Sequence, residues 1–330
     1  MRNPTDAGLA VTYRCNGRCV MCNIWKGPQE EEISPDCYEK LPSSLRTINV
    51  SGGEPFLRDD LSDIIRILKK RCPRSKIIIS TNGLLPEKIE RVMRQVIAQD
   101  RDMGVALSLD GTEDLHDEIR GARNSYRLVL ETLRRLRSIG ARNVRFSFTI
   151  LRENVKEMRR VYHLARSSGI EFTTQLAQGS AHYFKIEIEA GPAPEILKEE
   201  LRHIMRSELM SVHPKRWFRA YYLYGLHAFA SERMRIAPCT AGRDFFFMSP
   251  SGNIYPCNVL NYIVGNIQTS PFTEIWGSAI THAIRRHTAM CPQRCWMICS
   301  ARTSIAKKLI PALGWIVRKQ LLSAMGREAL

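Results

Sequence analysis

The sequence lacks a long apolar run, a nucleotide-binding glycine motif and any histidine in its first third. The best candidate for a membrane segment, residues 309–317, is too short to span a bilayer and contains Pro311. No P-loop is present and no Gly-x-Gly spacing follows the first expected strand, which argues against a Rossmann enzyme. The first histidine is His116. The cysteines therefore carry most of the chemical information.

The composition is that of a globular protein. The chain has 330 residues, of which 44% are hydrophobic and 25% charged, enough for one large or two moderate domains. Its net charge of +16 could suit an anionic partner but is read more simply as a solvated basic surface. Residues 1–8 do not resemble a signal peptide, so we expect the ten cysteines to be metal ligands in a reducing cytoplasm rather than disulfides.

Three cysteines form the first candidate metal site. Cys15, Cys19 and Cys22 are separated by three and two residues. Thiolates at this spacing can bind three irons of a [4Fe–4S] cluster and leave the fourth iron open. A closed zinc site needs a fourth ligand, and none lies nearby in the sequence. Ordinary buried thiols and a zinc site completed from a distant segment are the alternatives.

An alternating pattern predicts six strand–helix units between residue 9 and about residue 175. The strands are expected at residues 9–13, 47–51, 76–80, 104–109, 143–150 and 171–175. The helices are expected at residues 61–70, 87–98, 126–138 and 155–166, with a short helix after Ser34-Pro35. Such units favour a parallel sheet curled into a partial α/β barrel.

Polar segments follow the carboxyl ends of these strands, where the reacting groups of a barrel belong. They are the cysteine loop, Gly52-Gly53-Glu54-Pro55, Ser80 to Gly83, Ser108 to Gly111, Thr149 with Asn154, and Gln175. We expect these segments to form one site, with Thr149 and Gln175 as candidates near the substrate.

The CxxxCxxC loop followed by the GGEP segment resembles the radical S-adenosylmethionine (radical SAM) superfamily. The resemblance implies an α/β fold with a partial (β/α)6 TIM-type barrel. It also implies a [4Fe–4S] cluster on Cys15, Cys19 and Cys22 that binds S-adenosylmethionine through its open iron.

The same resemblance implies a set of cofactor-binding residues. The GGEP segment of the family holds the amino group of S-adenosylmethionine, and strand ends hold its ribose. These roles fall here on Gly52, Gly53 and Glu54, and on Ser80, Asn82, Ser108 and Asp110. Arg120 resembles the arginine that pairs with the cofactor carboxylate in the SPASM/twitch branch; a surface arginine is the alternative. Met21 stands where the family usually has an aromatic residue, at a backbone contact to adenine.

A second group of cysteines lies near the C-terminus. Cys239, Gly252 and Cys257 fit the CX9–15GX4C hairpin of SPASM and twitch domains, and the turn Ser249–Asn253 between apolar strands independently predicts a hairpin. Cys291, Cys295 and Cys299 add three thiols. Four of these five cysteines are expected to hold one auxiliary [4Fe–4S] cluster, and a four-cysteine zinc ribbon is the alternative. Cys37 and Cys72 are expected to be structural.

Four regions are expected along the chain. They are a radical SAM core at residues 1–190, a helical connector at 191–235, a small α+β twitch/SPASM-like domain at 236–305 and a basic helical tail at 306–330. The connector contains a predicted helix at residues 195–209 and an aromatic-rich stretch, residues 213–230. Such a stretch usually packs in a core, although it could also line a substrate cavity.

The resemblance implies a radical SAM oxidoreductase that abstracts a hydrogen atom from its substrate, passes an electron to the auxiliary cluster and is supplied by an electron donor such as flavodoxin or ferredoxin. The cysteine loop begins at residue 15, so we expect no peptide-recognition domain before it and favour a small molecule, such as a sugar or natural-product intermediate. A peptide maturase or epimerase and a non-enzymatic metal-binding protein are the alternatives. No nucleic-acid partner is expected.

The tail mixes basic and bulky apolar residues at helical spacing. Packing of this helix on the rest of the protein is the simplest interpretation, and contact with a membrane surface is the alternative. The protein is expected to be cytoplasmic, with peripheral membrane contact through the tail as the alternative.

Overall fold

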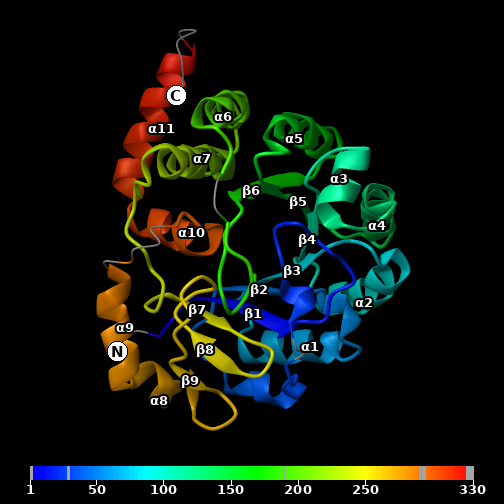
Figure 1. Ribbon diagram of the computed structural model, residues 1–330, viewed down its shortest axis with the longest axis vertical. Helices are drawn as coiled ribbons and strands as arrows, with labels where there is room; N and C mark the ends of the chain where they lie inside the picture. Colours follow the sequence, from blue (N-terminus) through cyan, green and yellow to red (C-terminus); the bar gives the residue numbers. More distant parts are fainter. Residues whose placement is uncertain (1–2, 28–29, 189–190, 290, 292–294, 325–330) are drawn as a thin grey trace.

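A single sheet organises the computed structural model, which describes residues 3–27, 30–188, 191–289, 291 and 295–324. Within these residues the strand order is β6-β5-β4-β3-β2-β1-β7-β8-β9 (Figure 1). The strands are β1 (Asp6–Thr12), β2 (Thr47–Gly52), β3 (Lys76–Thr81), β4 (Gly104–Ser108), β5 (Asn143–Ile150), β6 (Glu171–Leu176), β7 (Phe245–Met248), β8 (Asn253–Tyr255) and β9 (Gly265–Asn266).

Strands β1 to β6 are the six strands that the sequence predicts. Each pairs in parallel with the next, and together they form the partial (β/α)6 barrel, so the predicted fold class is confirmed. Since neighbouring strands are parallel, their carboxyl ends meet at one edge of the barrel.

Helices cover the outside of the sheet and continue beyond it. They are α1 (Leu61–Arg71), α2 (Pro86–Gln99), α3 (Glu113–Arg120), α4 (Ser125–Ser138), α5 (Met158–Ser167), α6 (Pro194–Leu209), α7 (Pro214–Glu232), α8 (Phe272–Gly277), α9 (Ala279–Ala289), α10 (Ile298–Lys307) and α11 (Leu309–Ala324). Short 3-10 helices lie at Ile24–Lys26, Pro35–Lys40, Pro55–Leu57 and Val155–Glu157. The helix expected after Ser34 is the 3-10 helix Pro35–Lys40.

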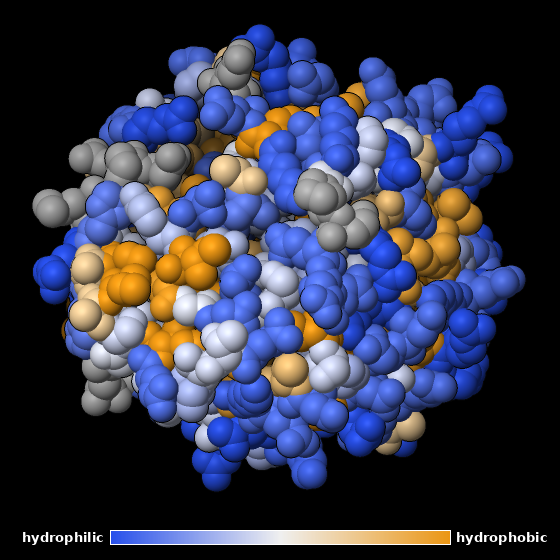
Figure 2. Space-filling view, turned by 60° about the horizontal axis from the view of Figure 1, so that its bottom comes forward, coloured by the Kyte–Doolittle hydropathy of each residue, from blue (hydrophilic) through white to orange (hydrophobic). Residues whose placement is uncertain are grey.

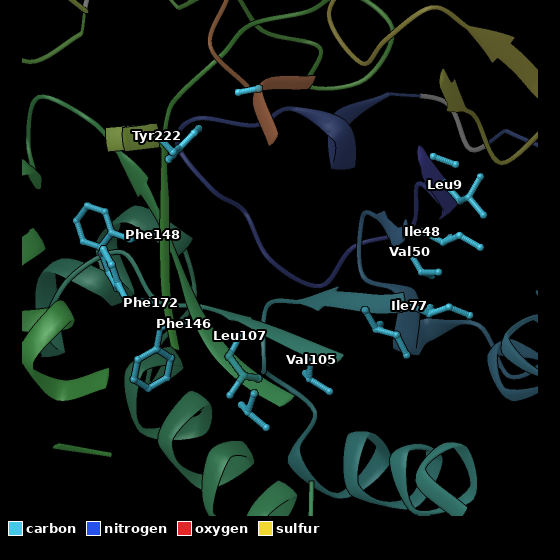
Figure 3. Packing of buried hydrophobic residues seen from close by; sticks show 14 of the residues in the cluster. Leu9, Ile48, Val50, Ile77, Val105, Leu107, Phe146, Phe148, Phe172 and Tyr222 are labelled. Atoms are coloured by element: carbon cyan, nitrogen blue, oxygen red, sulfur yellow. The ribbon is translucent and has the colours of Figure 1, made fainter. Parts of the chain in front are cut away.

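The main hydrophobic core lies between the sheet and its outer helices. Alternate residues of β5 are buried, and Phe146 and Phe148 point outward together with Phe172 of β6 (Figure 3). Burying one such side chain contributes about 1.5–3 kcal/mol. The other face of these strands carries polar or small residues, such as Ser147 and Thr173, and this face lines the inside of the barrel.

The predicted C-terminal hairpin is present as β7 and β8, and it extends the barrel sheet. Strand β7 pairs in parallel with β1, with Asp6 opposite Phe245 and Leu9 opposite Met248. Strand β8 returns antiparallel to β7. The second group of cysteines is thereby connected to the first strand of the barrel.

The aromatic stretch of the connector forms α7 and is used for packing. Tyr222 stacks on Trp296, with ring centroids 6.1 Å apart, and the Trp296 indole N–H donates to the Tyr222 carbonyl oxygen at 2.9 Å. Trp296 lies directly over Gly225, where an added Cβ would be 2.4 Å from the indole ring. Only a glycine lets the segment between Cys295 and Cys299 approach α7 so closely.

One face of the surface is largely hydrophilic. Figure 2 shows one face on which hydrophobic residues form several separate patches among hydrophilic ones. None of the helices in the described part of the chain is long and apolar enough to cross a membrane.

The Gly225 contact gives a testable prediction. We expect Gly225→Ala to lower the free energy of unfolding of the metal-free protein by about 1–3 kcal/mol, because the new methyl group overlaps Trp296. Gly314→Ala is a matched control in the middle of α11, where an added Cβ meets nothing within 4 Å. The control should stabilise the protein by about 0.5–1 kcal/mol. Urea denaturation measures both, and equal stabilisation by the two substitutions would contradict the packing interpretation.

Candidate functional site

A cavity of about 220 Å³ lies at the carboxyl ends of the barrel strands. Its walls include most of the residues that the sequence singled out. They are Cys15, Cys19, Met21, Cys22, Gly52, Gly53, Ser80, Asn82, Ser108, Arg120, Thr149 and Gln175. The structure therefore brings the first cysteine group and the polar strand ends together.

The cysteine loop is held against the barrel by backbone hydrogen bonds. The amides of Arg18 and Val20 donate to the carbonyl oxygens of Arg120 and Ile119 at the end of α3, both at 2.9 Å. On the other side, Gly53 packs against the loop so tightly that an added Cβ would lie 2.2 Å from the Arg14 carbonyl oxygen. The glycine pair of the GGEP segment thus allows close backbone packing beside the thiols.

The three thiols have surroundings that suit metal ligands. The Cys15 sulfur accepts from the Gly17 amide at 3.4 Å, and the Cys19 sulfur accepts from the Arg120 guanidinium at 3.6 Å. Burial raises the pKa of Cys15 to about 12 and that of Cys22 to about 11. Metal binding requires the thiolate, so loading these sites releases protons. The donor set fits a three-thiolate cluster.

Glu54 lies behind the cavity wall and is completely buried. Its carboxylate accepts from the Phe56 amide at 3.2 Å, the Thr81 hydroxyl at 2.8 Å and the Asn82 amide at 2.8 Å. Burial raises its pKa to about 7, and these hydrogen bonds oppose the rise. In this arrangement Glu54 fixes the end of β3, and its direct contact with a cofactor amino group stays a prediction.

Asp110 also lies behind the wall, where it orients Arg120. The buried Asp110 carboxylate forms an ion pair with Arg120 and accepts from the Thr149 amide at 2.6 Å. Although burial opposes the charge, Asp110 and Cys19 raise the pKa of Arg120. With an exposure of 9%, Arg120 is not the surface arginine considered as the alternative. Its pairing with a cofactor carboxylate stays a prediction.

Several cavity residues were missed by the sequence analysis. They include Asn49, Ser51, Ser147, Gln178 and Tyr183. Tyr183 donates to the Ser51 hydroxyl at 3.3 Å and lies near the Gly52 carbonyl oxygen at 3.4 Å. The inward-facing positions of the alternating strands were the available signal for the first three. Tyr183 belongs to the segment after β6, whose position no local pattern predicts.

The second group of cysteines also converges. Cys239, Cys257, Cys291, Cys295 and Cys299 line one compact cavity together with Asn258 and Met297. The Cys257 sulfur accepts from the amides of Val259 at 3.4 Å and Leu260 at 3.2 Å. Burial raises the pKa of Cys257, that of Cys295 to about 11 and that of Cys299 to about 12. Five thiols in one cavity fit the expected four-thiolate cluster, and the choice of four stays open.

In neither cysteine group do three thiols of the described residues lie close enough together to bind one metal ion. Among the residues that the structure describes, no three His, Cys, Asp or Glu side chains are close enough to hold one metal ion. A cubane does not require this convergence, since each thiolate binds a different iron. Cys37 and Cys72 lie outside both cavities, and the Cys72 thiol donates to the Pro42 carbonyl oxygen at 3.4 Å.

The two cavities share a wall. Asn258, Met297 and Cys299 line both of them. A third cavity of about 1490 Å³ adjoins the first through Ala177 and Gln178. Its walls come from the segment after β6, the end of α7 and residues 259–262. Charged groups of both signs line it, including Lys185, Glu187 and Arg233.

The chain is similar to two known domain families. Residues 9–165 match the radical SAM superfamily, and residues 239–300 match an iron–sulfur cluster-binding domain, SPASM. The AdoMet-dependent heme synthase of Methanosarcina barkeri is 24% identical over 82% of this chain and 81% of the relative. The antilisterial bacteriocin subtilosin biosynthesis protein AlbA of Bacillus subtilis is 23% identical over 85% and 61%.

Solved structures show the same fold. Streptococcus suis SuiB bound to S-adenosylmethionine has a TM-score of 0.66 and 14% identity, covering 86% of this chain and 68% of SuiB. The protein anSMEcpe with bound AdoMet has a TM-score of 0.62 and 16% identity, covering 86% of this chain and 83% of that protein.

The buried Glu54 carboxylate gives a prediction for stability. In Glu54→Gln, the side-chain NH2 group cannot accept the Asn82 amide, so we expect the free energy of unfolding of the metal-free protein to fall by about 1–3 kcal/mol. Because the pKa of Glu54 is raised from 4.5 to about 7, its contribution to wild-type stability is full below pH 4.5 and declines as pH rises through 7.

The difference in the free energy of unfolding between the wild type and Glu54→Gln should therefore be largest at low pH and smaller above pH 7. Urea denaturation at several pH values measures it, and the exposed Glu39→Gln is the control that should change little. A difference that widens with rising pH would contradict this role of Glu54.

Proposed function

Residues 9–165 belong to the radical SAM superfamily and residues 239–300 form a SPASM iron–sulfur domain, and from this we propose that the protein is an enzyme that oxidises its substrate by hydrogen-atom abstraction. When bound, the [4Fe–4S] cluster and S-adenosylmethionine supply a 5′-deoxyadenosyl radical that removes a hydrogen atom. The single observation that carries the proposal is the shared cavity of three thiols and five polar strand ends.

The residues of the barrel would bind and orient the cofactor. We assign the cluster to Cys15, Cys19 and Cys22, and the methionine carboxylate to Arg120, whose guanidinium lies between Asp110 and the Cys19 sulfur. Ser80, Asn82 and Ser108 offer hydroxyl and amide groups for the ribose. Glu54 and Asp110 hold these groups in place from behind the wall.

The second group of thiols would hold an auxiliary cluster that takes up one electron from the substrate. This assignment is supported by the shared wall, because Cys299 lines both the thiol cavity and the barrel cavity. Removal of a hydrogen atom, one electron and one proton gives a product that has lost two hydrogens.

We propose that the substrate enters through the cavity of about 1490 Å³. This volume exceeds the roughly 300–1,000 Å³ of ordinary small-molecule pockets, so it admits a molecule much larger than a single sugar. A small-molecule substrate agrees with the name of the heme synthase relative. A ribosomal peptide is the second candidate, and the size of the cavity also favours it. A structurally similar protein, SuiB, has been crystallised with its precursor peptide SuiA.

The first functional prediction concerns cluster content and S-adenosylmethionine cleavage. After anaerobic reconstitution with iron and sulfide, we expect about eight irons per chain for two cubanes and formation of 5′-deoxyadenosine under reducing conditions. The triple variant Cys15→Ala, Cys19→Ala, Cys22→Ala should retain about four irons and form no 5′-deoxyadenosine.

The double variant Cys239→Ala, Cys257→Ala is the matched control. It should lose the auxiliary cluster, retain the barrel cluster and still cleave S-adenosylmethionine without oxidising substrate. Stoichiometric zinc with no 5′-deoxyadenosine in the wild type would instead establish the non-enzymatic alternative. With a candidate substrate, unchanged product mass with deuterium uptake from solvent would show epimerisation in place of oxidation.

The second functional prediction concerns substrate entry. Gly191 lies in the wall of the large cavity, where an added Cβ meets nothing within 4 Å. We expect Gly191→Trp to raise KM for substrate at least about tenfold, as lost binding energy of about 1.4 kcal/mol would do, while substrate-independent cleavage of S-adenosylmethionine stays unchanged. Gly314→Trp places the same ring at an equally open position on α11 and should alter neither activity. Equal KM values for the two variants would exclude this entry route.

A further inference from the structure

The outer face of α11 carries an apolar stripe in solvent. Ile310, Leu313, Val317 and Leu321 are 85%, 44%, 55% and 61% exposed, and they recur at the spacing of one helix face. Together with Gly314, Arg318 and Leu322 they surround a shallow apolar hollow on the helix surface. Isolated exposed apolar residues are common, but four on one helix face form a patch of the kind that marks an interaction surface.

The opposite face of α11 already anchors the helix to the protein. Trp315 stacks on Tyr224 with ring centroids 5.0 Å apart, and Ala312 and Ile316 are buried in the main core. In Figure 1 the helix runs along the outer edge of the molecule beside α7 and α6. The exposed stripe is therefore not needed to attach α11, and its residues can be changed without opening the core.

The apolar surface continues beyond α11 onto the loop between α6 and α7. The Gln320 side chain donates to the Leu209 carbonyl oxygen at 3.0 Å, which places this loop beside the end of α11. Met210 and Val212 of the loop are 58% and 82% exposed. Two separate segments thus present apolar side chains in the same part of the surface.

The charged residues of α10 and α11 have one sign. Residues 298–324 contain no Asp or Glu. The exposed Lys308 precedes the first residue of the stripe, and the exposed Arg318 lines the apolar hollow beside Val317. Arg206, one helical turn before Met210 on α6, is also exposed. A second copy docked on this face would bring basic residues together without acids to pair them, within a protein of net charge +16. An anionic lipid surface complements both the apolar stripe and its basic rim.

We propose that the outer face of α11 and the adjoining α6–α7 loop form a docking surface for an anionic lipid membrane. The apolar side chains enter the boundary between headgroups and acyl chains, while Lys308 and Arg318 contact the anionic headgroups. The helix lies along the membrane and does not cross it. This surface is separate from the cavities of the proposed reaction, so its test does not depend on catalysis.

Vesicle flotation tests the proposal with the full-length reconstituted protein. We expect binding to vesicles of equal parts phosphatidylcholine and phosphatidylglycerol, weaker binding to phosphatidylcholine alone, and loss of binding as salt is raised. The variant Ile310→Ser, Val317→Ser should reduce the partition coefficient at least about tenfold, because both apolar groups leave the interface. Arg318→Glu should weaken binding to the anionic vesicles only.

Ile280→Ser is the matched control, because Ile280 is 58% exposed on α9 outside the proposed surface. It should bind vesicles like the wild type, and all four proteins should form 5′-deoxyadenosine equally. Absence of wild-type binding to anionic vesicles overturns the proposal. An equal loss of vesicle binding in Ile280→Ser and in the Ile310→Ser, Val317→Ser variant also overturns it. Concentration-dependent dimerisation in sedimentation that the α11 substitutions abolish would show that a second copy occupies the face instead.

Discussion

Strand β1 is the element on which both thiol sites depend, because it forms hydrogen bonds through both of its edges. One edge pairs with β2 of the barrel and the other with β7 of the C-terminal hairpin. The cysteine loop follows the carboxyl end of β1, and an ion pair joins Asp6 at its start to Arg302 of α10, the helix that carries Cys299. Strand β1 thus positions the loop that carries Cys15, Cys19 and Cys22, and its ion pair helps to position the helix that carries Cys299.

The barrel strands carry small or polar residues on the face that lines the cavity. Gly8, Asn49, Ser80 and Ser147 face the cavity, whereas Phe146 and Phe148 of the same sheet point outward into the core. Small polar side chains leave open volume beside the thiols and offer hydrogen bonds to a bound molecule. The rigid layer of large residues behind them keeps that volume from collapsing.

Local patterns were sufficient for the six barrel strands and the hairpin, and the family resemblance led us to expect that each cysteine group lies in one cavity. The alternation of apolar and polar residues in β5 can be recognised in the sequence and predicts which residues are buried. The pairing of β7 with β1 was not predictable, since it joins residues more than two hundred positions apart and leaves no local periodicity. Glu54 and Asp110 show a second limit. Their carboxylates accept hydrogen bonds from backbone amides, and Asp110 also pairs with Arg120. Only the tertiary structure reveals these partners, and direct contact of either residue with a cofactor stays a prediction.

The contact between Trp296 and Gly225 joins the cluster-binding segment to α7. The cluster-binding segment is fitted to a helix that precedes it in the chain, since the indole ring covers the glycine and donates to the Tyr222 carbonyl oxygen. A chimera that exchanges residues 239–300 alone would replace Trp296 and leave the Gly225 surface of α7 without the indole ring that covers it. The smallest transferable module therefore begins with α7, and homologous replacements have to include both partners of this contact.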